Sequence, residues 1–277
     1  MTGPVLILGG GGRLGRLLHP VWPDPNVVWH SRRPLAGHVS FDILDDAHAL
    51  ETAVRGSRAV LCLAGVTNTS AVADMQNNVR LAAAAVRSAH AVGCPRVLLA
   101  SSAAVYGRSD EALSEDGLCV PLSEYGRAKL EMEHETAKLG SDLGVQVCAL
   151  RIGNIAGADA ILGGWKEGFV LDVFDDGASP RRSYIGPVTL ARVLDTLSRA
   201  ARLPDVLNIA APGSVTMGDL LDAAGLPWAP RPARNDAIQS VVLDTSRLER
   251  YVQFQPVEST PPQMCAEIRA TQGTVQK

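Results

Sequence analysis

The sequence predicts a doubly wound α/β fold, in which helices cover both faces of a parallel sheet. Three observations over the first 150 of 277 residues support this fold. Short apolar runs alternate with helix-like stretches, as in consecutive strand–helix–strand units. The runs are continuously apolar, which is typical of parallel strands buried on both faces. A glycine cluster joins the first run to the first helix.

The elements follow in order along the chain. After Arg151 the pattern weakens, and residues 153–187 look rich in loops. The proline-rich segment 227–232 can form neither a helix nor a central strand. The end from Thr271 is expected to be frayed. Strands are expected at 5–8, 27–29, 39–41, 59–64, 96–101, 146–151 and 206–209, and helices at 14–18, 47–54, about 72–92, about 125–139, 188–201 and 216–224.

This pattern predicts a division of labour along the chain. A dinucleotide-binding core is expected over 1–157, with returning segments at about 183–210. A small, shortened C-terminal substrate lobe is expected from 158–182 and 211–277.

Composition excludes several functions. A net charge of −3 and 4% aromatic residues argue against nucleic acid or an anionic membrane as the main partner. No apolar run is long enough to span a bilayer, and the N-terminus lacks the features of a signal peptide. Five scattered cysteines without a CxxC pair predict reduced thiols, and the sparse histidines predict no metal site. We therefore expect a cytoplasmic protein with a small-molecule substrate.

The strongest early motif is Gly9-xx-Gly12-xx-Gly15, which follows an apolar strand and opens a helix. The first glycine permits a tight turn, the second lets the backbone approach a pyrophosphate, and the third allows close helix–sheet packing. The strand and helix context favours dinucleotide binding over a plain turn. The motif predicts a Rossmann-type fold, with Arg13 and Leu14 also at the cofactor.

The end of the second strand predicts which cofactor binds. NAD-specific folds place a carboxylate there for the ribose 2′-hydroxyl, whereas this chain has Ser31, Arg32 and Arg33, with Arg13 nearby. Guanidinium groups match a phosphate, so we predict NADP(H) and leave NAD(H) open. A solvated basic turn is the alternative. Asp42 is expected either to accept from the adenine amine or to cap a helix.

The candidate catalytic residues follow the fifth strand. Ser102 ends this strand, and Tyr125 and Lys129 are spaced to share one helix face. An ammonium group beside a phenol lowers the phenol's pKa from about 10. A serine hydroxyl at the neighbouring strand end can polarise a carbonyl. Together the three predict a proton-transfer site that interconverts an alcohol and a ketone.

In these motifs the chain resembles the extended short-chain dehydrogenase/reductases, the NAD(P)-dependent epimerase/dehydratase family. The resemblance is specific over residues 4–157 and patchy beyond. The matching residues are Gly9-xx-Gly12-xx-Gly15, Asp42, Leu63-Ala-Gly65, Asn78-Val79, Ser101-Ser-Ala-Ala-Val-Tyr-Gly107, Tyr125-xxx-Lys129, Leu150-Arg-Ile-Gly-Asn154, Arg182-Ser-Tyr-Ile185 and Leu207-Asn-Ile-Ala210.

The resemblance implies roles for single residues. Tyr125 would be the general acid/base, Lys129 would orient the nicotinamide ribose, and Ser102 would bind the reacting oxygen. Asn154 would sit beside the substrate, and Arg182 would meet a substrate phosphate or be a surface charge. The backbone of Leu63, Ala64 and Gly65 would flank the cofactor. The resemblance also suggests a homodimer through helices near 81–92 and 124–139, whose small alanine face would pack either on the partner or on its own sheet.

Departures from the family pattern narrow the reaction. Ala103 and Ala104 stand where sugar dehydratases carry an acidic pair, so dehydration lacks its acid and base. Only 31 positions separate Arg151 from Arg182, which shortens the segment that grips a nucleotide. With the NADP signal, this favours an oxidoreductase acting on a sugar-like or small carbonyl substrate. The alternatives are a nucleotide-sugar 4-epimerase with tightly held cofactor and a non-catalytic NADP-binding redox sensor.

Overall fold

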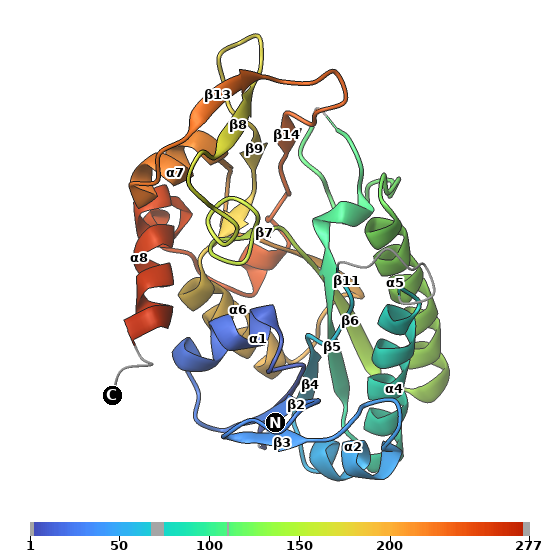
Figure 1. Cartoon of the computed structure of the whole chain (residues 1–277). Coiled ribbons are helices and arrows are strands. Elements are labelled where there is room, and N and C mark those ends of the chain that lie inside the picture. Colours follow the sequence, from blue (N-terminus) through green and yellow to red (C-terminus); the bar gives the residue numbers. More distant parts are fainter. Residues whose placement is uncertain (1–2, 68–74, 110, 274–277) are drawn as a thin grey trace.

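A seven-stranded parallel sheet forms the centre of the computed structural model, which describes residues 3–67, 75–109 and 111–273 (Figure 1). The strand order is β11-β6-β5-β4-β1-β2-β3. The chain winds outward in both directions from β1 and β4, and such a switch point opens a crevice at the carboxyl ends of the strands. The strands are β1 (Val5–Leu8), β2 (Val27–Ser31), β3 (His38–Ser40), β4 (Ala59–Cys62), β5 (Arg96–Ser102), β6 (Gln146–Ile152) and β11 (Val206–Ile209).

Helices cover both faces of the sheet, which confirms the predicted Rossmann-type fold. α2 (Ala47–Val54), α4 (Asn77–Val92) and α5 (Glu124–Leu143) pack on one face. α1 (Arg13–Leu18) and α6 (Pro187–Arg199) pack on the other face (Figure 1). Fully apolar strands can exist here because each face of the sheet has its own hydrophobic core.

Local sequence signals set the limits of the helices. The Asp46 side chain accepts from the Ala49 amide at the start of α2, and Ser123 accepts from Gly126 at the start of α5. α4 and α5 end at the left-handed glycines Gly93 and Gly144. The expected start of the third helix, at about residue 72, lies outside the described residues.

Asp42 does not cap a helix, so this alternative for its role is wrong. Its carboxylate accepts from the Leu44 amide at 2.9 Å, two residues along, which forms a turn ahead of α2. The cap of α2 is Asp46, four residues later. Three aspartates in one short loop, Asp42, Asp45 and Asp46, made the cap ambiguous in the sequence.

Short strands together with the helices α7 and α8 form the upper part of the molecule in Figure 1. The segment 153–187 is not all loop, because it contributes strands to three small sheets. The proline-rich segment forms an exposed strand that pairs only with β8, so it is not central. These elements are β7 (Asn154–Ile155), β8 (Val170–Val173), β9 (Arg181–Arg182), β10 (Tyr184–Ile185), β12 (Val215–Thr216), α7 (Met217–Ala224), β13 (Ala229–Pro232), β14 (Ser240–Val241) and α8 (Pro261–Gly273).

Helix α8 was not predicted from the sequence. Two polar side chains, Glu267 and Thr271, are buried on it beside Met264 and Cys265, so no continuous apolar stripe marks the helix. The Glu267 carboxylate accepts from the amide of Thr189 at 2.9 Å, in the first turn of α6. Glu267 therefore satisfies a helix start from a distant part of the chain.

The alanine face of α4 packs within its own chain. Ala82, Ala85, Val86 and Ala89 belong to the core between the sheet and the helices. Of the two alternatives for this face, packing on its own sheet is confirmed.

Among the described residues, no helix combines the length and apolar character that a membrane span requires.

Candidate active site

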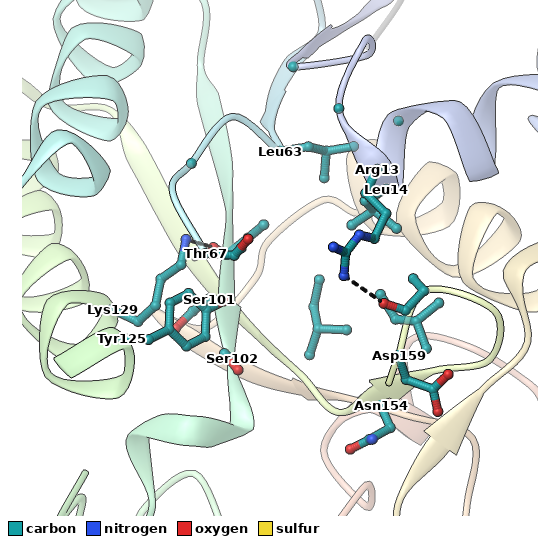
Figure 2. Close-up of a pocket in the computed structure, with 18 of the residues that line it drawn as sticks. Arg13, Leu14, Leu63, Thr67, Ser101, Ser102, Tyr125, Lys129, Asn154 and Asp159 are labelled. Atoms are coloured by element: carbon teal, nitrogen blue, oxygen red, sulfur yellow. Dashed lines mark hydrogen bonds between the residues drawn. The ribbon is translucent and has the colours of Figure 1, made fainter. Parts of the chain in front are cut away.

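A cavity of about 380 Å³ opens at the carboxyl ends of the central strands. Eleven predicted site residues line this cavity together, although they come from five separate segments (Figure 2). The cavity thus lies at the switch point of the sheet, where α/β proteins bind ligands. The eleven are Gly9, Gly12, Arg13, Leu14, Gly15, Leu63, Gly65, Ser102, Tyr125, Lys129 and Asn154.

The glycine loop is shaped by close approaches that a side chain would block. Gly9 has φ +86°, and a Cβ there would lie 2.6 Å from the backbone nitrogen of Ala64. A Cβ on Gly15 would collide with the carbonyl oxygen of Gly10. The loop therefore presents backbone atoms without side chains to the cavity. The N-cap of α1 is Gly12, so no side chain caps the first amides of this helix. This cradle fits the pyrophosphate of a dinucleotide.

His30 forms hydrogen bonds with the glycine loop. This contact was not predicted from the sequence. This buried side chain on β2 accepts from the Gly9 amide through Nδ1 at 3.3 Å. Its carbonyl oxygen accepts from the Gly10 amide at 2.6 Å. Burial lowers the pKa of His30 and keeps the ring neutral. A lone histidine at a strand end carries no sequence signal for this contact.

The predicted Ser102, Tyr125 and Lys129 cluster lies on one side of the cavity (Figure 2). The Ser102 hydroxyl lies next to the Tyr125 phenol, close enough to affect its pKa. Lys129 Nζ lies 5.9 Å from the centroid of the Tyr125 ring and donates to the carbonyl oxygen of Ala100 at 2.8 Å. The cluster therefore holds two hydroxyl groups at the cavity, with a buried amine behind them.

The pKa of Tyr125 is raised, so the expected lowering by Lys129 is wrong for this structure. Burial raises the pKa, and the neighbouring Ser102 hydroxyl lowers it in part. Lys129 is 4% exposed, and burial lowers its own pKa to about 8. Its Nζ binds a strand carbonyl rather than the phenol oxygen. The phenol therefore keeps its proton at neutral pH, which suits a general acid.

A buried ion pair lies next to this cluster and was also not predicted. Glu133 follows Lys129 by one helical turn on α5 and accepts from Arg151 at 2.8 Å. Ser101 donates to the same carboxylate. Arg151 lies on β6 beside the end of β5. The pair therefore ties α5 to the strand ends that carry Ser101 and Ser102.

The residues predicted for the adenosine half of the cofactor do not line the cavity. The Ser31 hydroxyl donates to the carbonyl oxygen of Arg33 at 2.5 Å and so folds the turn that holds the exposed Arg32 and Arg33. Arg13 points elsewhere, because its guanidinium donates to the carbonyl oxygen of Ala158 at 3.3 Å across the cavity (Figure 2). Arg13 is thus not grouped with Arg32 and Arg33 as expected.

The structure does not bring Arg182 to the cavity. Its guanidinium donates to backbone carbonyl oxygens of Arg181, Ile238 and Gln239 at 2.7–3.0 Å. These contacts tie β9 to the segment before β14 rather than leaving the side chain at the cavity.

The Leu63–Gly65 segment is held by a buried asparagine. Asn78 accepts from the Val66 amide and donates to the Val66 carbonyl oxygen, both at 3.1 Å. A Cβ on Gly65 would lie 2.7 Å from Asn78 Oδ1 and 3.2 Å from Lys129 Nζ.

The described residues contain no group of three or more histidine, cysteine or acidic side chains that could hold a metal ion.

Comparison with known proteins agrees with this geometry. A family model for the NAD dependent epimerase/dehydratase family matches residues 5–173. UDP-glucose 4-epimerase of Azospirillum brasilense is 29% identical over 177 residues, which cover 56% of this chain and 50% of that protein. The chain thus spans about half the length of this curated relative.

Two solved structures share the fold over nearly their full length. MoeE5 in complex with UDP-glucuronic acid and NAD has a TM-score of 0.77 at 23% identity, covering 98% of this chain and 100% of that one. UDP-N-acetylglucosamine 4-epimerase from Methanobrevibacter ruminantium M1 has a TM-score of 0.77 at 20% identity, covering 99% of each chain. At these identities the structures establish the fold alone.

The family match is the more specific result, because it spans the glycine loop, the Ser102, Tyr125 and Lys129 cluster and Asn154. The chain belongs to the NAD dependent epimerase/dehydratase family.

Proposed function

We propose that this protein is an NAD(P)-dependent oxidoreductase that transfers hydride at a secondary alcohol or ketone of a sugar-like or small carbonyl substrate. The observation that carries the proposal is that Ser102 and Tyr125, with Lys129 behind them, line the same cavity as the glycine loop. The family match supports the same chemistry. The shared cavity supports a single site for cofactor and substrate.

The side chains divide the work in the direction of reduction. A bound nicotinamide supplies the hydride that reaches the carbonyl carbon. The Ser102 hydroxyl donates a hydrogen bond to the carbonyl oxygen and polarises it. Tyr125, whose pKa is raised by burial, carries a proton at neutral pH and gives it to that oxygen as the alcohol forms. In oxidation Tyr125 takes the proton back.

NADP(H) is our proposed cofactor, with NAD(H) as the alternative. Support comes from the end of β2, which has no carboxylate for a ribose 2′-hydroxyl and is followed by the exposed Arg32 and Arg33. Asp42 is proposed near the adenine. Against this stands the NAD in the complexes named by several structural neighbours. A titration of the purified protein with NADP⁺ and NAD⁺, together with a spectrum of any co-purified nucleotide, decides between the two.

A nucleotide-sugar 4-epimerase is the second candidate, favoured by the curated relative of that activity. It uses the same Ser102 and Tyr125 pair but keeps its cofactor through the cycle. Arg182, proposed at the sequence level for a substrate phosphate, is bound to backbone carbonyl oxygens instead, and this favours the first candidate. Non-exchanging co-purified NAD⁺ together with conversion of UDP-glucose would reverse the order.

The test of the catalytic assignment is Tyr125→Phe, which removes the hydroxyl and keeps the ring. Turnover is expected to fall by about 10²–10⁴, with cofactor affinity unchanged within about threefold. Tyr251→Phe is the matched control outside the cavity. Unchanged turnover in Tyr125→Phe would refute the catalytic assignment of Tyr125, whereas cofactor binding without any turnover in the wild type would favour a redox sensor.

We also propose that residues 158–182 and 211–277 form the substrate lobe over the core. A homodimer through the outer surfaces of α4 and α5 is proposed as well. The outer surfaces of α4 and α5 carry side chains that are exposed to solvent in the single chain, among them Arg87, Arg127, Glu131 and Lys138. Light scattering at micromolar concentration tests the dimer, and a monomer mass contradicts it.

A further inference from the structure

Arg13 joins the glycine loop to the opposite wall of the cavity. It is the first residue of α1, directly after Gly12, and its side chain is exposed. Its Nη1 donates to the carbonyl oxygen of Ala158 at 3.3 Å, which Figure 2 shows as a dashed line. Ala158 and Asp159 line the cavity across from Tyr125. One side chain thus connects the proposed phosphate cradle with the opposite wall.

The wall that Arg13 reaches is a loop of fixed shape, residues 157–164. The Asp159 carboxylate accepts from two amides of this loop through Oδ1, at 3.0 and 3.4 Å. The buried Tyr184 hydroxyl donates to Oδ2 of the same carboxylate at 2.5 Å and so ties the loop to β10. A Cβ on Gly163 would lie 2.4 Å from the carbonyl oxygen of Gly157, so the two ends of the loop touch. The loop is therefore held on one side by Tyr184 and on the other by Arg13.

Arg13 has donors that the protein does not use. A guanidinium carries five N–H donors in a planar fork, and among the described residues the Arg13 side chain makes the one hydrogen bond to Ala158. None of the salt bridges between described residues involves Arg13. The edge formed by Nε and Nη2 therefore remains for an anion, which an arginine binds through two parallel hydrogen bonds.

We infer that Arg13 is a positioning residue that bridges the two walls of the cavity: Nη1 holds the carbonyl oxygen of Ala158 while Nε and Nη2 bind the cofactor's pyrophosphate, so that a bound dinucleotide holds loop 157–164 in place over the cavity. The inference rests on the proposed cofactor site and is independent of the proposed reaction.

The two contacts of Arg13 strengthen each other through the entropy of one side chain. An exposed arginine loses rotamer freedom when its guanidinium is fixed, and this loss opposes the bond to Ala158 in the free protein. Once an anion holds the guanidinium, the bond to Ala158 forms without a second loss. This gives positive coupling between the anion and the loop. By linkage, a loop that is better fixed raises the affinity for the anion by the same factor.

Hydrogen–deuterium exchange of the amides in loop 157–164 tests the inference. The probe is ADP, which carries a pyrophosphate and no nicotinamide, and adenosine is its control without phosphate. Arg13→Met removes the guanidinium and keeps a long side chain at an exposed position, so the fold is expected to be retained. Arg16→Met is the matched control, because Arg16 is exposed on the same helix, donates to the carbonyl oxygen of Gly11 and does not line the cavity.

In the wild type, saturating ADP is expected to slow exchange in the loop by about five- to tenfold, and adenosine is expected to leave it unchanged. The slowing should disappear in Arg13→Met and persist in Arg16→Met, with ADP raised to saturation in each variant.

A second measurement approaches the coupling from the loop side. Tyr184→Phe removes the hydrogen bond to Asp159 and loosens the loop, so it should weaken ADP binding measured by calorimetry. In the Arg13→Met background the same change should have no effect on ADP affinity, because the bridge is already lost. Tyr106→Phe removes a buried hydroxyl outside the cavity and should leave ADP binding unchanged in both backgrounds.

The inference is overturned if ADP binds without slowing exchange, if exchange becomes faster, or if Arg13→Met and Arg16→Met behave alike. If the wild type binds neither ADP nor NADP⁺, the proposed cofactor site fails together with the inference. Failure of the proposed reaction gives a different result. In that case Tyr125→Phe has no effect on turnover, while ADP still slows exchange in a manner that depends on Arg13.

Discussion

The amide of Gly9 donates a hydrogen bond to Nδ1 of His30 at 3.3 Å, and Nε2 of the same ring lies 2.9 Å from the carbonyl oxygen of Phe41. Since Nδ1 accepts, the proton of the neutral ring is on Nε2. One buried imidazole thus joins the glycine loop to the chain beyond β3. The shape of the proposed cofactor cradle depends on a residue that does not line the cavity.

His30→Ala is therefore expected to weaken cofactor binding by about tenfold, the value of one lost hydrogen bond plus loop disorder. Direct titration with NADP⁺ and NAD⁺ measures the change. His48→Ala, an exposed histidine on α2, is the control and should bind as the wild type does. Equal affinities in the two variants would show that the glycine loop holds its shape without His30.

The same contact predicts an acid sensitivity. Burial lowers the pKa of His30 in the folded protein, so the unfolded chain binds the extra proton first. The contribution of His30 to stability is complete above about pH 6.5, the ordinary histidine value, and is lost as pH falls through the lowered folded pKa. Urea unfolding at pH 7 and pH 5 should show a smaller acid loss in His30→Ala than in His48→Ala.

Lys129→Met is expected to stabilise the protein while removing a proposed catalytic group. Burial lowers the pKa of Lys129 from 10.5 to about 8, so its charge opposes folding at neutral pH. The variant also loses the hydrogen bond from Lys129 to the carbonyl oxygen of Ala100. After this loss is subtracted, the free energy of unfolding is expected to rise by roughly 2 kcal/mol at pH 7.

The sign of the pH dependence checks this explanation for Lys129. Between about pH 8 and 10.5 the unfolded chain binds the proton that the folded protein has released, so wild-type stability gains as pH rises. The advantage of Lys129→Met in urea unfolding should therefore shrink by more than half from pH 7 to pH 9.5. A constant advantage across this range would contradict it.

Glu133→Gln is expected to cost about 3–5 kcal/mol, because it leaves the buried Arg151 guanidinium without its carboxylate. The control is Glu131→Gln, which changes an exposed residue on the same helix and should stay within about 0.5 kcal/mol. Urea unfolding at neutral pH measures both. A loss for Glu133→Gln as small as that of the control would mean that solvent or another group compensates Arg151.

The double change Arg32→Ala and Arg33→Ala tests the proposed cofactor preference. Loss of two guanidinium groups should weaken NADP⁺ binding by about 10–100-fold and leave NAD⁺ binding within about threefold. Arg80→Ala with Arg87→Ala, two exposed arginines on α4, controls for net charge. An equal loss of affinity for both nucleotides, or no loss for either, would mean that Arg32 and Arg33 do not bind the 2′-phosphate of NADP⁺.

The central sheet and one side of the site could be predicted from the sequence alone. Continuous apolar runs can be satisfied only between two helical layers, so strand and helix order predicted β1 to β6 and β11. Gly9, Gly12 and Gly15 were readable because glycine is required where backbone atoms approach closely. The catalytic cluster could also be predicted, because helix spacing and a strand end bring together Ser102, Tyr125 and Lys129. These are local properties of the chain.

The environment of these residues depends on how distant segments of the chain pack together. The spacing of Tyr125 and Lys129 suggested a lowered phenol pKa, but burial and the Ala100 carbonyl oxygen, both set by distant segments, reverse the direction. The contacts of His30, Glu133 and Tyr184 join residues far apart in sequence, and no periodic pattern encodes such pairs. Burial and long-range hydrogen bonding depend on the packed whole, and they set the charge states and orientations that chemistry needs.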